Sequence, residues 1–136
     1  MAENGGNEVG VDRAYERLPA DLRPQLGKVW SDAEWAELSH QERRRLSAWI
    51  LHLIGSDAAD ALEAGSFDTR TGTHASRTLS VVDEQGWREL ARIQEEALEA
   101  VLAIKAASAE RLAESGEDGM LALSAMLCFE VPRRPS

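Results

Sequence analysis

The sequence has 136 residues, enough for one domain with a modest core, and its formal net charge is −9. This acidic balance argues against direct contact of the chain with DNA, because phosphate contacts need a basic protein face. No apolar run approaches the roughly 20 residues of a membrane helix, the N-terminus lacks the pattern of a signal peptide, and the single cysteine excludes an intramolecular disulfide. We therefore expect a cytoplasmic protein without membrane contact.

The two ends of the chain are not expected to fold. Residues 1–10 are rich in Gly, Asn and Glu, which predicts disorder. Pro19 and Pro24 interrupt residues 11–29, which predicts an extended lead-in. We expect one domain over residues 11–132 and a tail at 133–136.

The first predicted helix begins at a capping box. In this motif the Ser31 side chain accepts from the amide of Glu34, and the Glu34 side chain accepts from the amide of Ser31. Trp30 and Trp35 occupy the two positions of a hydrophobic staple across the same start. A short helix is therefore expected up to about Leu38.

A second capping box, formed by Ser39 and Glu42, predicts a longer helix over residues 40–64. Apolar residues recur there at steps of three and four, which is typical of a helix with one apolar stripe. Gly65 is expected to end the helix in a left-handed conformation. The polar residues 66–76 predict a loop.

A long helix is predicted over residues 83–115, with Asp83 as its N-cap and Gly116 at its end. At 1.5 Å per residue such a helix is about 50 Å long. A chain of this size has few other residues to cover a helix of that length, so we expect a helix of a second copy to cover it. The candidate dimer interface is a near-heptad apolar stripe of Trp87, Leu90, Leu98, Val101, Ile104 and Leu112.

Two stretches have the composition of strands. Residues 78–82 alternate and are rich in β-branched side chains, and residues 121–131 form a continuous apolar run that suits a buried strand. Antiparallel pairing of these stretches completes the predicted fold class. That class is α+β and mostly α-helical, with two to three N-terminal helices, one long helix and a small two-stranded antiparallel β element.

The residues with catalytic or metal-binding side chains form no known motif. His40, His52 and His74 are isolated from any nucleophile or ligand pattern. We interpret Cys128, within an apolar stretch, as a small buried hydrophobe. We therefore expect no enzymatic activity, no metal site and no cofactor.

The basic run of Arg43, Arg44 and Arg45 is the candidate nucleic-acid contact. The interpretation that we favour is a solvated helix face that pairs with nearby carboxylates such as Glu42. Residues 83–118 carry ten acidic side chains against four basic ones, so the long helix is not expected to lie along DNA.

Four of the seven aromatic residues are tryptophans, which we interpret mainly as packing anchors of the core. The alternative is a pocket for a small apolar ligand between the helices and the two strands. The candidate pocket residues are Trp30, Trp35, Trp49, Trp87 and Phe129.

Several motifs, taken in order, resemble ArsR-type winged-helix regulators of actinobacteria. They are residues 61–67 (ALEAGSF), 67–70 (FDTR), 73–78 (THASRT), 82–90 (VDEQGWREL) and 110–117 (ERLAESGE), followed by an apolar stretch that ends at Phe129 and Glu130. The resemblance spans about residues 11–132. It implies the dimerising, ligand-sensing region that follows the winged helix in such regulators.

We also expect the chain to depart from that family by lacking the winged helix, because ten residues before position 11 are too few for one. Our first hypothesis is a dimerisation or effector module of a bacterial transcription regulator without its own DNA reader. Its expected partner is a second copy or a full-length regulator. The alternatives are a protein that binds a small apolar ligand, and a component of a transcription factor that contacts DNA directly.

Overall fold

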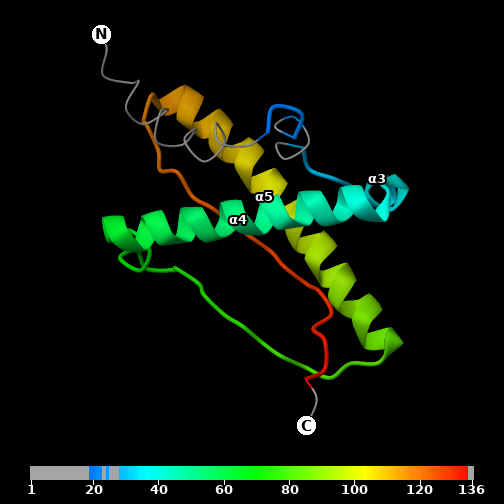
Figure 1. Cartoon of the computed structure of the whole chain (residues 1–136). Helices are drawn as coiled ribbons and strands as arrows, with labels where there is room; N and C mark the ends of the chain where they lie inside the picture. Colours follow the sequence, from blue (N-terminus) through cyan, green and yellow to red (C-terminus); the bar gives the residue numbers. More distant parts are fainter. Residues whose placement is uncertain (1–18, 23, 25–27, 135–136) are drawn as a thin grey trace. The chain divides into compact units, whose positions relative to one another are not determined.

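A computed structural model of the chain describes residues 19–22, 24 and 28–134 (Figure 1). The predicted disorder of residues 1–10 and most of the predicted lead-in lie outside these ranges. The chain divides into two compact units, Met1–Ala75 and Ser76–Ser136. The elements are α3 and α4 in the first unit and α5 in the second.

Helix α3, Asp32–Glu37, begins as its sequence predicts. The amide of Glu34 donates to Ser31 Oγ at 3.2 Å, and the amide of Ser31 donates to Glu34 Oε1 at 3.4 Å. The rings of Trp30 and Trp35 meet edge to face, with centroids 6.3 Å apart. Both the capping box and the hydrophobic staple are therefore confirmed.

Helix α4, His40–Ala64, has the predicted bounds and the second capping box. The amide of Glu42 donates to Ser39 Oγ at 3.1 Å, and the amide of Ser39 donates to Glu42 Oε2 at 2.9 Å. Gly65 ends the helix with a φ of 75°, in the left-handed region. Because only glycine adopts this conformation without a steric cost, the predicted helix end is confirmed.

The core of the first unit is small. Within the described ranges only Leu22 and Leu46 are fully buried, at 2% and 1% exposure. Half-buried apolar side chains of α4 follow Leu46 at steps of three and four, among them Trp49, Ile50 and Leu53. Most of the predicted apolar stripe of this helix is therefore at least half-buried, with Leu62, at 62% exposure, as its uncovered end.

Helix α5, Glu84–Ser115, forms the second unit together with irregular segments on either side. Asp83 caps its start by accepting from the amide of Gly86 at 2.8 Å. Gly116 ends it with a φ of 73°. Its 32 residues confirm the predicted long helix, about 48 Å from end to end.

The predicted two-stranded β element is wrong. None of the described residues lies in a strand, and Figure 1 draws residues 76–83 and 117–134 as plain tubes. Val81 is 89% exposed and Leu121 is 82% exposed, so neither stretch lies in a buried sheet. The physical reason is that β-branched and apolar side chains favour a strand only where neighbouring strands and a covering layer complete it.

The expectation that Cys128 is buried is wrong for the same reason, since its stretch has no covering layer and the thiol is exposed. The segment after α5 nevertheless returns to the helix at one point. Gly119, with a φ of 71°, lies so close to the Leu112 side chain that an added Cβ would meet a methyl carbon at 3.0 Å. This close approach holds the start of the segment against the last turn of α5.

Candidate functional site

The main surface feature of the second unit is the apolar side of α5. Its apolar residues extend over roughly half of the helix circumference, at about 100° per residue. Four of the six predicted interface residues are half-buried: Leu90, Leu98, Val101 and Leu112. The other two, Trp87 and Ile104, are 38% and 62% exposed.

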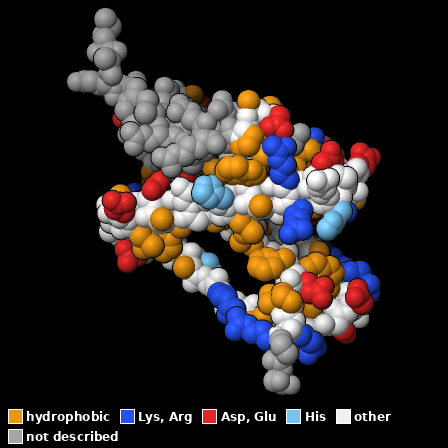
Figure 2. Space-filling model, viewed as in Figure 1, with side chains coloured by type: hydrophobic (Ala, Val, Ile, Leu, Met, Phe, Trp, Pro, Cys, Tyr) orange, Lys and Arg blue, Asp and Glu red, His pale blue; other side chains and the backbone are white. Residues whose placement is uncertain are grey.

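Two further large side chains of α5 are exposed and lie outside the predicted interface. They are Ile93, at 57%, and Leu102, at 39%. Hydrophobic side chains accordingly reach the surface in the face drawn in Figure 2. The apolar surface of α5 is therefore wider than the predicted stripe, which followed the densest run of apolar positions and left out Ile93 on its flank.

The segment that follows α5 adds more exposed apolar side chains to the same unit. Met120, Leu121, Leu123, Leu127, Phe129 and Val131 are each between 46% and 82% exposed. Among the described residues, the second unit has no fully buried side chain. This unit thus presents apolar surface from both its helix and its return segment.

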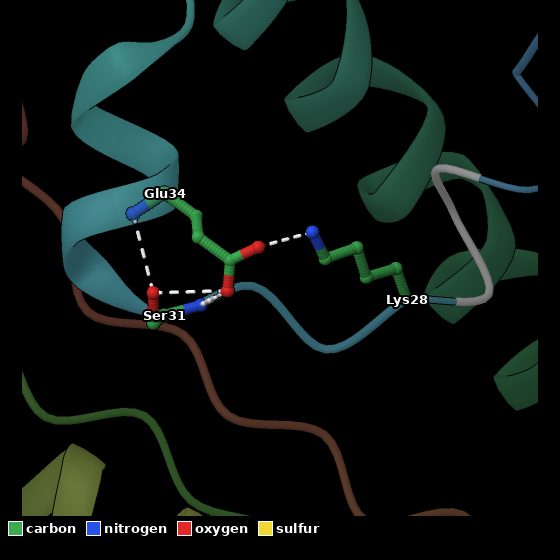
Figure 3. A network of polar contacts seen from close by, with 3 residues as sticks. All are labelled: Lys28, Ser31 and Glu34. Atoms are coloured by element: carbon green, nitrogen blue, oxygen red, sulfur yellow. Dashed lines mark hydrogen bonds and ion pairs between the residues drawn. The ribbon is translucent and has the colours of Figure 1, made fainter.

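The start of α3 holds a polar network, which Figure 3 shows from close by. The Lys28 ammonium donates to the Glu34 carboxylate and lies 4.4 Å from the centroid of the Trp30 ring. The pKa of Glu34 is lowered, first by the hydrogen bond from Lys28 and then by those from Ser31. Each contact supports the cap of α3, so the network has a structural role.

The five predicted pocket residues are divided between the two units. Trp30 and Trp35 contact each other, while Trp49 meets the ring of His52 edge to face at 5.5 Å. Trp87 and Phe129 belong to the second unit. The pocket for an apolar ligand stays a prediction.

The arginine run is only partly available to a partner. Arg45 donates to both oxygens of Asp21, at 2.7 and 3.4 Å, and this hydrogen bonding lowers the pKa of Asp21. Arg43 is half-buried and Arg44 is exposed. The partner of Arg45 is thus Asp21, 24 residues away, which no local sequence signal indicates.

The described ranges contain neither a metal-binding cluster nor a membrane-spanning helix. They hold no group of three or more His, Cys, Asp or Glu side chains placed to bind a metal ion. None of their helices is long and apolar enough to cross a membrane.

No family model, curated protein or solved structure matches this chain.

Proposed function

We propose that this chain is a self-association module of a bacterial transcription regulator, similar to the region that follows the winged helix in ArsR-type regulators. The observation that carries the proposal is the accessible apolar side of α5. Ile93 and Ile104, which lie 11 residues apart on the same flank of the helix, are 57% and 62% exposed.

An unpartnered apolar face of this kind is costly in water. Burial of apolar surface stabilises by about 25 cal/mol per Å², and soluble monomers seldom expose large contiguous apolar patches. Homodimer interfaces, in contrast, are rich in apolar side chains. A second copy that covers α5 would supply burial that the described part of the chain, with two fully buried residues, does not supply by itself.

The charge distribution supports association rather than direct DNA reading. The stretch around α5 has ten acidic against four basic side chains, and Arg45 is already paired with Asp21. A negatively charged surface repels the phosphates of DNA. The module is therefore proposed to act on transcription through the chain that it joins.

Two measurements test this function. Light scattering over a concentration series should give the mass of a dimer. The chain fused to an unrelated DNA-reading domain that represses a reporter only as a dimer should restore repression, whereas that domain alone should not.

A monomer at tens of micromolar, together with a silent fusion, would refute the proposal. A salt-dependent shift of a DNA duplex by the chain alone would instead favour direct DNA contact.

A further inference from the structure

One flank of α5 has the spacing of a coiled-coil contact. Six residues follow one another at steps of three and four along the helix, and we call them the Ile/Ala seam. They are Leu90, Ile93, Ala97, Ala100, Ile104 and Ala107. Such steps keep one line of side chains facing a partner helix over several turns.

Most of this seam is uncovered. Ile93 and Ile104 are 57% and 62% exposed, and Ala100 and Ala107 are exposed as well. The small side chains at Ala97 and Ala100 let a second helix approach closely, near the lower end of the usual 8–10 Å between helix axes. The seam can therefore pack against a second helix, and the two helix axes would be closest at its middle.

We infer that the seam binds the same seam of a second copy, with the two α5 helices antiparallel. This inference rests on the proposed self-association and adds its surface and orientation. With the two-fold axis midway between Ile93 and Ile104, each Ile93 faces Ile104 of the second copy. Each Ala97 then faces Ala100, so the large side chains pack on either side of a close central approach.

The charge of Arg111 favours this orientation. Arg111 continues the seam one turn after Ala107, and Glu89 flanks its other end. In the antiparallel pair Arg111 lies opposite Gly86 and within one turn of Glu89 of the second copy, so its guanidinium offsets the repulsion between that carboxylate and the nearby Glu110. In a parallel pair, Arg111 would face Arg111 and repel it.

Cysteine crosslinking tests the orientation. Two variants, Ile93→Cys and Ile104→Cys, are made in a Cys128→Ser background, carry tags of different length and are oxidised separately and as a mixture. The antiparallel seam predicts a disulfide between the chains only in the mixture. In either variant by itself, the cysteines of the two copies would lie about 11 residues, or about 16 Å, apart along the helix axis, which is too far for a disulfide.

The matched control concerns two exposed alanines of α5. Ala100→Glu places a carboxylate at the middle of the seam, whereas Ala106→Glu places it on the other side of the same helix, one turn before Glu110. Because an unpaired buried charge is strongly unfavourable, Ala100→Glu should raise the dimer Kd by at least about a hundredfold. Ala106→Glu should leave the Kd nearly unchanged, which also shows that the helix tolerates glutamate.

The outcomes separate this inference from the proposed function. Crosslinking in the mixture alone, with the dimer lost only in Ala100→Glu, supports the antiparallel seam. Crosslinking within either single variant, or a dimer by light scattering that forms no disulfide in any sample, overturns the seam and leaves self-association standing. A monomer by light scattering, together with a silent fusion, overturns both.

Discussion

Exchange of Ile104 for serine measures how much free energy the exposed side of α5 contributes to association. Complete burial of an isoleucine side chain stabilises by about 1.5–3 kcal/mol. In the single chain Ile104 is 62% exposed, so a partner that covers it gains about 1–2 kcal/mol per copy and about 2–4 kcal/mol in a symmetric dimer. Loss of that burial should raise the dimer Kd by about 30-fold to 1,000-fold.

The assay is sedimentation equilibrium of the parent chain and of Ile104→Ser over the same concentration range. The matched control is Leu62→Ser in α4, because Leu62 has the same exposed fraction of 62%. Serine has a helix propensity similar to that of isoleucine and less than about 0.7 kcal/mol below that of leucine, so neither exchange should melt its helix, which circular dichroism checks. An unchanged Kd in Ile104→Ser, or an equal change in Leu62→Ser, would refute a specific role for α5.

Three further predictions concern stability, each measured at one fixed chain concentration because any association would add to the apparent stability. Leu46→Ala should lower the free energy of unfolding by about 2–5 kcal/mol in urea titrations, since Leu46 is 1% exposed; a loss below 0.5 kcal/mol would contradict its core role. Gly55→Ala should stabilise the protein by about 0.4–1 kcal/mol, because there is free space around the added Cβ in the middle of α4. Gly116→Ala should destabilise it by about 1 kcal/mol, because alanine disfavours a φ of 73°. Changes of the same sign in both variants would contradict the backbone conformations assigned to the two glycines. The pKa values of Asp21 and Glu34 are lowered from 3.8 and 4.5, so the stabilisation by these carboxylates is complete above those values and is lost as the pH falls through the folded pKa. Tryptophan fluorescence should report this loss of stability in acid. The double variant Asp21→Asn with Glu34→Gln should make stability depend less on pH in this range.

The helix boundaries were predictable because their causes are local. Ser31 and Ser39 each stand three residues before a glutamate, and both pairs form the reciprocal bonds of a capping box. Gly65 and Gly116 end their helices at positive φ. These signals act within one turn of the backbone, so a single sequence contains all the information that they need.

The strands were predicted wrongly because their stability is not local. Residues 78–82 and 121–131 have apolar and β-branched side chains, yet the chain gives them neither a paired strand nor a covering layer. Composition records that these stretches are suited to burial. It does not record which surface, in the same chain or in another one, would bury them.

The candidate interface was predictable in part. Periodicity placed all six predicted residues on α5, but it did not separate the half-buried Leu98 and Val101 from the exposed Ile93 and Ile104. That distinction depends on which neighbours cover each flank of the helix. The Ile/Ala seam appears only when spacing and exposure are considered together.

The sequence by itself determined where the three described helices begin and end, since caps and glycine stops act over a few residues. It also determined the acidic balance that disfavours contact with phosphate. Only the tertiary structure decided that Arg45 pairs with Asp21, that Cys128 is exposed, and which flank of α5 is left uncovered. These outcomes depend on contacts between residues far apart in the chain, and the three-dimensional path of the backbone sets which of those residues meet.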